Sequence, residues 1–260
     1  MTTSPLRSSN EISRVDLGLS VAGRILEATP ANIVRAVQAM REGGIIVSPT
    51  VTNYCLLCDA TNPEAVEKVF AAKKRVKLGP LPVQIADPAR IREYVILPEG
   101  KRRQAVEAML PGEICFILPQ LYPFCERLTC GLGTIAISST THPVFRAVLE
   151  EFEGPVAATS ANISGQGDIH VSLEKAAYDL GEQVDAYLDD GPTSAGQAAG
   201  SRSMNTIVDL TFDVPMMVRE GWVPTDEVRR HLPDLVVDTT LYKNLLAERA
   251  RARTGSGQNG

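Results

Sequence analysis

Apolar positions in this chain recur at two spacings, and each spacing predicts a different kind of element. Ile33, Val37 and Met40 fall on one face of a helix over residues 31–42, which Thr29 caps. The same reasoning predicts helices over residues 62–73, 88–94, 101–110, 143–154 and 173–180. Short apolar runs predict strands over residues 45–48, 81–86, 113–118, 134–138, 156–158, 185–188, 206–210 and 216–219. The order is not a strict repeat, so we expect a single α/β domain with helices packed on a twisted, mixed sheet.

The segment Pro155–Gly165 changes abruptly from apolar to polar. Val156–Ala158 has the small side chains of a central strand, and Thr159, Ser160 and Asn162 add hydroxyl and amide groups just beyond it. Polar groups at the end of a buried strand are a common way for an α/β protein to bind a ligand. The alternative is an ordinary strand followed by a polar turn. We expect Ser160 and Asn162 to be exposed loop residues that contribute little to stability.

A dense basic cluster, Lys73–Lys77, follows the predicted second helix. It is the strongest local charge feature in a chain whose formal net charge is −5. Four cations in five residues could bind a polyphosphate. Cations at the end of a helix are also favoured by the helix dipole and are commonly solvated. The cluster therefore has two interpretations, a phosphate site or a solvated helix end.

Composition excludes several classes of protein. With 260 residues, of which 44% are hydrophobic, the chain can bury a large core. The net negative charge argues against a general binder of nucleic acids or membrane surfaces, and no apolar run is long enough to span a bilayer. The first ten residues lack the apolar centre of a signal peptide, so we expect a cytoplasmic protein with no membrane partner. Both ends are polar and irregular, and we expect them to be flexible.

Several sequence patterns that would indicate a cofactor are weak or absent. Cys55 and Cys58 have the spacing of a redox or metal pair, but none of the three histidines stands at ligand spacing from them. Buried thiols are the better interpretation, and no metal ligand is predicted. The P-loop sequence is absent. Gly131–Ala136 matches the dinucleotide pattern, but a strand follows where a helix is required, so we interpret it as a turn.

Nine short motifs occur in a recognisable order along the chain. They are Gly43–Tyr54, Cys58–Asn62, Lys73–Arg75, Pro80–Val83, Leu110–Gly112, His142–Pro143, Ala158–Gly165, Thr206–Asp209 and Arg219–Gly221. Taken together they resemble the YrdC/Sua5 family of L-threonylcarbamoyladenylate synthases. The resemblance implies one YrdC-like domain with a concave, basic face over residues 28–224. It also implies an N-terminal extension, partly flexible, over residues 1–27 and a C-terminal helical extension with a flexible tail over residues 225–260.

The resemblance also implies a reaction. A nucleotidyltransferase of this family joins threonine, bicarbonate and ATP into threonylcarbamoyl-adenylate and pyrophosphate, which is the first half of a tRNA modification. It would use Mg²⁺ with the ATP, and tRNA or other RNA could contact the basic face. Lys73 and Arg75 would be catalytic. The implied nucleotide site is Lys73, Arg75, Lys77, Thr134, Ser160, Asn162 and Arg219, and the implied amino-acid site is Thr50, Thr52, Ser138, Thr159 and Asn205.

The chain departs from the family pattern on the substrate side. Ser138 stands where family members carry an arginine that contacts the amino acid, and Val51, Cys55, Gly79 and Asn205 replace other family residues. Losing a buried arginine–carboxylate pair typically costs ~2–5 kcal/mol, so threonine would bind weakly unless another cation substitutes. Two interpretations stay open. One is an active synthase or a paralogue with another amine or acyl acceptor, and the other is a non-catalytic module that binds nucleotide or RNA.

Overall fold

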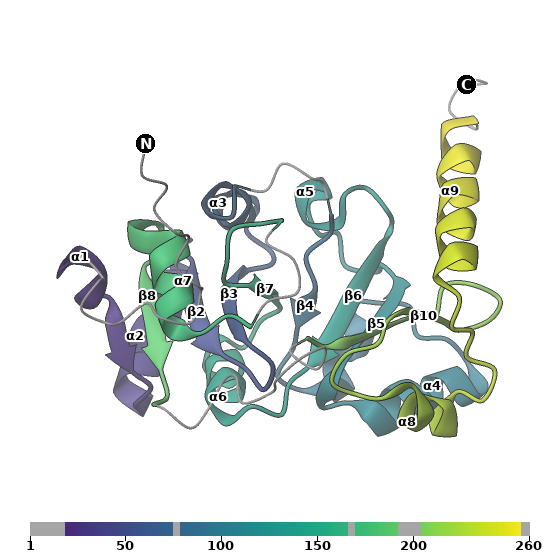
Figure 1. Ribbon diagram of the computed structural model, residues 1–260, viewed down its shortest axis with the longest axis horizontal. Helices are drawn as coiled ribbons and strands as arrows, with labels where there is room; N and C mark the ends of the chain where they lie inside the picture. Colours follow the sequence, from purple (N-terminus) through teal and green to yellow (C-terminus); the bar gives the residue numbers. More distant parts are fainter. Residues whose placement is uncertain (1–18, 75–78, 166–169, 192–203, 256–260) are drawn as a thin grey trace, which may run out of the picture.

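The computed structural model describes residues 19–74, 79–165, 170–191 and 204–255 (Figure 1). Arg75 and Lys77, which were predicted to bind the nucleotide, lie outside the described residues, as do residues 1–18 and 256–260 of the two ends. In the part that is described, ten strands form one sheet in the order β1-β8-β2-β3-β7-β4-β6-β5-β9-β10. The sheet contains both parallel pairs, such as β1–β8, and antiparallel pairs, such as β2–β3. The predicted mixed sheet is therefore confirmed.

The elements follow the predicted order. The strands are β1 Ile25–Glu27, β2 Ile46–Pro49, β3 Tyr54–Asp59, β4 Val83–Gln84, β5 Gly112–Pro119, β6 Thr134–Ser139, β7 Val156–Ser160, β8 Ala186–Asp189, β9 Thr206–Asp209 and β10 Met216–Arg219. The α-helices are α1 Leu19–Ala22, α2 Pro30–Arg41, α3 Pro63–Ala72, α4 Gly100–Met109, α5 Glu126–Thr129, α6 Pro143–Phe152, α7 Leu173–Leu180, α8 Thr225–His231 and α9 Thr239–Gly255. Two 3₁₀-helices, η2 Pro88–Glu93 and η3 Gly181–Gln183, complete the described chain.

Several elements differ from the prediction, and α1, β1, α5 and η3 were not predicted at all. β3 was not predicted, and its first residue lies in the predicted turn over residues 49–54. This strand is specified by pairing with β2 and with the distant β7, which local patterns do not reveal. β4 has two residues in place of the predicted 81–86. The predicted helix over residues 88–94 is the 3₁₀-helix η2, in which Asp87 caps only six residues.

Apolar side chains form two cores. The predicted face of α2, with Ile33 and Val37, packs with Phe145 of α6 in one of them. Val66 and Val69 of α3 belong to the other, larger core. Figure 1 shows α3, α5 and α7 on one side of the row of strands and α4, α6 and α8 on the other. The sheet is thus covered on both sides, which accounts for the apolar character of its strands.

β7 lies in the interior of the sheet, between β3 and β4, and is antiparallel to both. The predicted central strand is confirmed. Its register pairs Ser160 with Cys55 and Thr159 with Leu56. The polar end of β7 therefore lies beside the start of β3, directly after the turn that connects β2 to β3.

The C-terminal helix α9 projects from the end of the molecule near β10 (Figure 1). Tyr242 Oη donates to Asp209 Oδ2 at 3.1 Å, and Arg249 donates to the hydroxyl of Thr211 at 2.7 Å. The Arg249 guanidinium also lies 3.8 Å from the centroid of the Phe212 ring. These contacts attach the base of α9 to the end of β9. No helix among the described residues is long and apolar enough to span a membrane.

Candidate functional site

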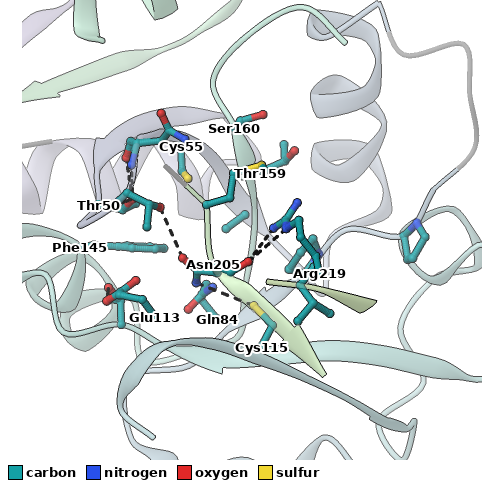
Figure 2. Close-up of a pocket in the computed structure, with 18 residues that line it drawn as sticks. Thr50, Cys55, Gln84, Glu113, Cys115, Phe145, Thr159, Ser160, Asn205 and Arg219 are labelled. Carbon is teal, nitrogen blue, oxygen red and sulfur yellow. Dashed lines mark hydrogen bonds between the residues drawn. The ribbon is translucent and has the colours of Figure 1, made fainter. Parts of the chain in front are cut away.

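A pocket of about 280 Å³ lies between the end of β7 and the start of β9 (Figure 2). Its wall combines hydroxyl, amide and charged groups with apolar side chains. The volume is just below the range of about 300–1,000 Å³ that is typical of small-molecule sites, so it suits an amino acid better than a whole nucleotide. The lining residues are Thr50, Thr52, Asn53, Cys55, Pro80, Pro82, Gln84, Glu113, Cys115, Thr140, Phe145, Ala158, Thr159, Ser160, Met204, Asn205, Ile207 and Arg219.

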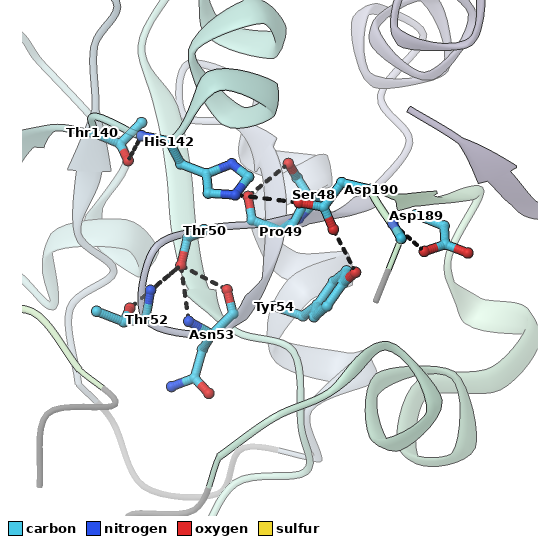
Figure 3. A network of polar contacts seen from close by, with 11 residues as sticks. Ser48, Pro49, Thr50, Thr52, Asn53, Tyr54, Thr140, His142, Asp189 and Asp190 are labelled. Carbon is cyan, nitrogen blue, oxygen red and sulfur yellow. Dashed lines mark hydrogen bonds and ion pairs between the residues drawn. The ribbon is translucent and has the colours of Figure 1, made fainter. Parts of the chain in front are cut away.

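The turn between β2 and β3 supplies one wall of the pocket. Thr50 Oγ1 accepts hydrogen bonds from the backbone amides of Thr52 at 3.2 Å and Asn53 at 3.0 Å, and it donates to the carbonyl oxygen of Asn53 at 2.6 Å (Figure 3). Asn53 Oδ1 accepts from the amide of Val171 at 2.6 Å. The hydroxyls of Thr50 and Thr52 are 3.3 Å apart, so they lie on the same side of the turn. All three polar side chains of the turn are buried, so their positions are well fixed.

Lys73 connects the end of α3 to the end of β7. Its Nζ donates to the carbonyl oxygens of Ser160 and Asn162, the latter at 2.7 Å, and to Asn162 Oδ1 at 3.4 Å. The hydroxyl of Ser160 donates to the same Oδ1 at 2.7 Å. Lys73 is 3% exposed and Asn162 is 5% exposed, whereas Ser160 is half-buried. The expectation of two exposed loop residues is therefore wrong, because Lys73 holds this loop against the protein.

Asn205 and Arg219 form another wall. Nε and Nη2 of Arg219 donate to the carbonyl oxygen of Asn205 at 3.2 and 2.9 Å. The side chain of Asn205 accepts from the Thr52 hydroxyl at 3.4 Å, which joins this wall to the first turn. Trp222 N donates to the carbonyl oxygen of Met204 at 2.8 Å. A Cβ on Gly221 would lie 2.2 Å from that same oxygen, so only glycine allows the close approach.

A carboxylate and an amide lie near Phe145 at the lower end of the pocket in Figure 2. Glu113 Oε1 accepts from the hydroxyls of Thr140 at 3.2 Å and Thr141 at 3.0 Å, and from the amide of Thr141 at 3.1 Å. Burial raises the pKa of Glu113 above its ordinary value, and these hydrogen bonds oppose the rise. Gln84 is 5% exposed, and its Oε1 has no hydrogen-bond partner among the described residues.

Two thiols also line the pocket. Burial raises the pKa of Cys55 to about 12, and it raises the pKa of Cys115 and of the neighbouring Cys58 as well. Thiols with raised pKa values stay protonated at neutral pH, so these cysteines are poor nucleophiles and poor metal ligands. Within the described ranges, no group of three or more His, Cys, Asp or Glu side chains could hold a metal ion. The predicted buried thiol is confirmed at Cys58, whereas Cys55 is partly exposed to the pocket.

A second polar network lies behind the Thr50 turn (Figure 3). His142 Nε2 lies 3.3 Å from Asp190 Oδ2, and Tyr54 Oη donates to Asp190 Oδ1 at 3.0 Å. Burial lowers the pKa of His142, and the nearby Asp190 opposes the decrease. His142 Nδ1 is buried without a partner among the described residues. The network joins the start of α6 to the end of β8 and the start of β3, and none of these three residues lines the pocket.

The structure brings together most of the predicted ligand residues that it describes. Those lining the pocket are Thr50, Thr52, Thr159, Ser160, Asn205 and Arg219. Lys73 and Asn162 are bonded to the end of β7 beside it. Thr134 and Ser138 do not line the pocket. Thr134 pairs with Pro119 at the far end of β6, and Ser138 is fully buried, with its hydroxyl donating to the carbonyl oxygen of Ile114 at 2.7 Å.

Sequence reasoning missed Glu113, Gln84 and Phe145. A signal existed for Glu113, because a charged residue opens an otherwise apolar run over residues 113–118. No comparable signal marks Gln84, whose position depends on the pairing of β4 with β6 and β7. Phe145 lies in the predicted helix over residues 143–154, and it also packs in the smaller of the two cores.

Comparisons with known proteins show which family the chain as a whole is similar to. The model of the Sua5, YciO and YrdC proteins, described as "Telomere recombination", matches residues 38–221. The chain is 30% identical over 217 residues to the threonylcarbamoyl-AMP synthase of Bacillus subtilis, which covers 83% of this chain and 61% of that protein. It is 36% identical over 203 residues to a relative from Mycobacterium tuberculosis, covering 78% of this chain and 89% of that protein.

A solved structure is similar over the same region. The crystal structure of P. abyssi Sua5 complexed with L-threonine superposes with a TM-score of 0.74 at 26% identity, covering 84% of this chain and 62% of that chain. The chain thus spans a little over three fifths of the Bacillus and P. abyssi proteins. Since the family model matches well over half of its residues, the chain belongs to the family of Sua5, YciO and YrdC proteins.

Proposed function

We propose that this chain is a nucleotidyltransferase of the threonylcarbamoyl-AMP synthase type, which converts an amine, bicarbonate and ATP into a carbamoyl-adenylate and pyrophosphate. The observation that carries the proposal is the pocket itself. It gathers Thr50, Thr159, Ser160 and Arg219 from three segments that are far apart in the sequence. The threonylcarbamoyl-AMP synthase name of the Bacillus relative supports the same reaction class.

The proposed chemistry needs positioning and charge neutralisation more than acid–base catalysis. The amine adds to bicarbonate with loss of water and gives a carbamate. A carbamate oxygen then attacks the α-phosphorus of ATP, the bond between the α-phosphorus and the bridging oxygen breaks, and pyrophosphate leaves. Charge builds on the phosphoryl oxygens during this displacement, so fixed donors contribute most. A buried pocket also keeps water from the labile carbamate.

We assign the Ser160 and Arg219 side of the pocket to the phosphates. Arg219 provides a fork of N–H donors that suits phosphate oxygens, and Ser160, the last residue of β7, lines the same pocket. The geometry supports a different role for Lys73, because its Nζ donates to backbone carbonyl oxygens of the loop that carries Asn162. In this proposal Lys73 positions the loop. The catalytic roles of Lys73 and Arg75 and the phosphate contacts of Lys77 and Thr134 stay predictions.

Mg²⁺ would be bound through the phosphates of ATP in this proposal. Magnesium commonly keeps several waters and uses substrate phosphates together with one or two carboxylates. Glu113 is the carboxylate in the described pocket wall, and it lies away from Ser160 (Figure 2). The residues present therefore suit a metal ion that arrives with the nucleotide rather than one held by a protein cage. RNA binding on a basic face, the cytoplasmic location and the domain boundaries at residues 27 and 224 stay predictions.

The proposal is tested by incubating the full chain with ATP, bicarbonate and a panel of amines, and by measuring pyrophosphate release and the mass of the adenylate. Calorimetry with ATP gives the nucleotide affinity separately. Arg219→Gln should weaken ATP binding by about 1.5–3 kcal/mol, the range for a charge-assisted hydrogen bond. That corresponds to roughly 10- to 150-fold in Kd. Arg103→Gln, on the exposed face of α4, serves as the matched control.

One result would contradict the assignment of the phosphate side, and two others would favour an alternative function. If Arg219→Gln binds ATP as wild type does, the phosphate side is misplaced. If wild-type protein binds ATP but forms no adenylate with any amine, the non-catalytic nucleotide-binding alternative is favoured. If it binds RNA and no ATP, the RNA-binding module is favoured instead.

A further inference from the structure

The loop over residues 160–164 leaves the end of β7 and begins with Ser160 in the pocket wall. Its four backbone amides, at residues 161–164, all donate hydrogen bonds. Three of them donate to backbone carbonyl oxygens, which in chain order belong to Tyr54, Ser160 and Lys73. The amide of Ile163 donates instead to a side chain, Oδ2 of Asp179 in α7, at 3.1 Å. A carboxylate of α7 therefore holds a loop that lies 16 residues earlier in the chain.

The peptide unit between Asn162 and Ile163 is held at both of its polar groups. Its carbonyl oxygen, which belongs to Asn162, accepts from Lys73 Nζ at 2.7 Å. Its N–H group, which belongs to Ile163, donates to Asp179. The two groups of a planar trans peptide point in opposite directions. An ammonium and a carboxylate thus face the two ends of one peptide dipole, each with the sign of charge that this end attracts. The peptide plane cannot rotate without weakening both bonds.

The carboxylate of Asp179 is itself held in place. Lys175, one turn earlier on α7, donates from Nζ to the same Oδ2 at 2.5 Å. The side chains of Lys175 and Asp179 are 9% and 2% exposed. Such a pair contributes little net stability, because the cost of removing two charges from water offsets their attraction. Its clearest effect here is on geometry, since it fixes the oxygen that accepts from Ile163.

The clamped peptide reaches the pocket through the side chain of Asn162. Oδ1 of Asn162 accepts from the Ser160 hydroxyl at 2.7 Å. Of the residues that the structure describes, Ser160 lines the pocket, whereas Asp179 and Lys175 do not. If the peptide after Asn162 turned, the acceptor that orients the Ser160 hydroxyl would move with it. The orientation of a pocket hydroxyl therefore depends on a carboxylate outside the pocket.

We propose that Asp179 is a positioning residue of the nucleotide site. With Lys73 on the opposite edge, it clamps the peptide between Asn162 and Ile163 and so directs the Ser160 hydroxyl toward the phosphates of ATP. Lys175 holds Asp179 in the orientation that the clamp needs. The proposal rests on the proposed function, which assigns Ser160 to the phosphate side.

The test compares two replacements of similar size. Asp179→Asn and Asp179→Leu both remove the charge, but asparagine keeps an oxygen that can accept from the Ile163 amide. In calorimetry of the full chain, Asp179→Leu should have a Kd for ATP at least about tenfold above wild type, because small displacements of a binding group have effects of this size. Asp179→Asn should stay within about threefold of wild type. Asp226→Leu, at an exposed position of α8, is the matched control and should bind ATP as wild type does. Equal ATP affinities in Asp179→Asn and Asp179→Leu overturn the proposal.

Hydrogen exchange of the Ile163 amide, followed by NMR in the ligand-free proteins, reports on the clamp directly. Exchange of this amide should be at least about tenfold faster in Asp179→Leu than in wild type, and Asp179→Asn should restore most of the protection. The amide of Ser164, which donates to the Lys73 carbonyl oxygen, is the internal reference and should change less. A general loss of stability would accelerate both amides equally, and that result contradicts the clamp.

If Asp179→Leu does not fold, Asp179→Glu replaces it in the comparison. Glutamate keeps the charge and moves the oxygen by one methylene group, so it should bind ATP more weakly than Asp179→Asn does. The reverse order would mean that charge matters and position does not, which overturns the proposal.

Failure of this inference can be distinguished from failure of the proposed function. If wild type and Asp179→Leu bind ATP equally well, the proposed function stands and this inference falls. If wild type binds no ATP, the proposed function falls, and exchange of the Ile163 amide still decides whether Asp179 holds the loop.

Discussion

At the scale of single residues, Glu113 gives the clearest energetic prediction. Its pKa in the folded protein is above the unfolded value of 4.5 because the carboxyl is buried. A raised folded pKa contributes stability that is fully present below pH 4.5 and is lost as the pH rises through the folded pKa. A glutamine at this position cannot ionise, so Glu113→Gln should gain stability relative to wild type as the pH rises above 4.5.

The measurement is the free energy of unfolding of both proteins by urea between pH 4 and pH 8. The carbonyl oxygen of the introduced glutamine can keep the donors that now reach Oε1, so the comparison isolates the charge. A constant difference between the two proteins across this pH range would mean that Glu113 ionises as freely in the folded protein as in the unfolded chain. A polar group in a pocket often lowers the stability of a protein in exchange for function.

The residues that sequence reasoning found and missed differ in a consistent way. Thr159 and Ser160 were found because hydroxyls directly follow an apolar strand, which is a local pattern. Ser138 was placed in the substrate site by resemblance, yet its side chain is buried behind the pocket wall and bonded to Ile114. Glu113 and Gln84 reach the pocket through the pairing of strands that are distant in sequence. Local patterns predict residue type and strand, and long-range register decides which side chain meets the ligand.

At the scale of elements, the ammonium group of Lys73 joins the end of α3 to the end of β7, beside a backbone hydrogen bond from the Ser164 amide to the Lys73 carbonyl oxygen at 3.0 Å. Lys73→Met keeps the length of the side chain but removes the ammonium donor from the carbonyl oxygens of Ser160 and Asn162, and the Ser160 oxygen keeps only the bond from the Asn162 amide. Hydrogen bonds to a charged group typically contribute about 1.5–3 kcal/mol, so we expect a loss of that size in the free energy of unfolding. Lys101→Met, at an exposed position in α4, should change stability by less than about 0.5 kcal/mol.

The same experiment distinguishes the two roles considered for Lys73, which are positioning of the loop and contact with phosphate. If it positions the loop, both stability and ATP affinity should fall in Lys73→Met, because the Ser160 hydroxyl loses its fixed place. If Lys73 contacts only phosphate, ATP affinity should fall while urea unfolding matches wild type. An unchanged unfolding curve would therefore contradict the positioning role.

Helix boundaries were predictable to within about two residues, because their signals lie in the immediate sequence. Asn62 was predicted to begin α3, and its Oδ1 accepts from the amides of Glu64 and Ala65 at 3.0 and 3.2 Å. Ser172 caps α7 in the same way, through the amide of Lys175. β3 was missed for the opposite reason. Its hydrogen bonds go to β2 and to β7, about 100 residues away, and only the assembled sheet specifies it.

At the scale of the whole molecule, the network around His142 makes stability depend on pH. It joins α6 to the end of β8 through Asp190 and to the start of β3 through Tyr54. Burial lowers the folded pKa of His142 below its ordinary value of 6.5. A lowered folded pKa contributes stability that is present above pH 6.5 and is lost as the pH falls through the folded pKa, because the unfolded chain takes up the proton first.

We therefore expect the free energy of unfolding of wild type to decrease on acidification below pH 6.5, and His142→Asn to show a smaller decrease. Glu113 changes stability in the opposite direction with pH, so the double variant Glu113→Gln, His142→Asn isolates the remaining groups. His231→Asn, on the exposed surface of α8, is the control. If the free energy of unfolding decreases equally with acidification in wild type and in His142→Asn, protonation of His142 does not affect stability.

The backbone hydrogen bond from the Trp222 amide to the Met204 carbonyl oxygen has a consequence for the fluorescence of the protein. The chain has one tryptophan, so its entire indole fluorescence arises from this position, which is 37% exposed. Met204 and Asn205 line the pocket, and Arg219 lies three residues before the indole. A ligand that draws Arg219 away from the Asn205 carbonyl would change the surroundings of a single emitter. Emission intensity and wavelength would then report pocket occupancy in the unlabelled protein, and ligands could be ranked in a fluorimeter cuvette.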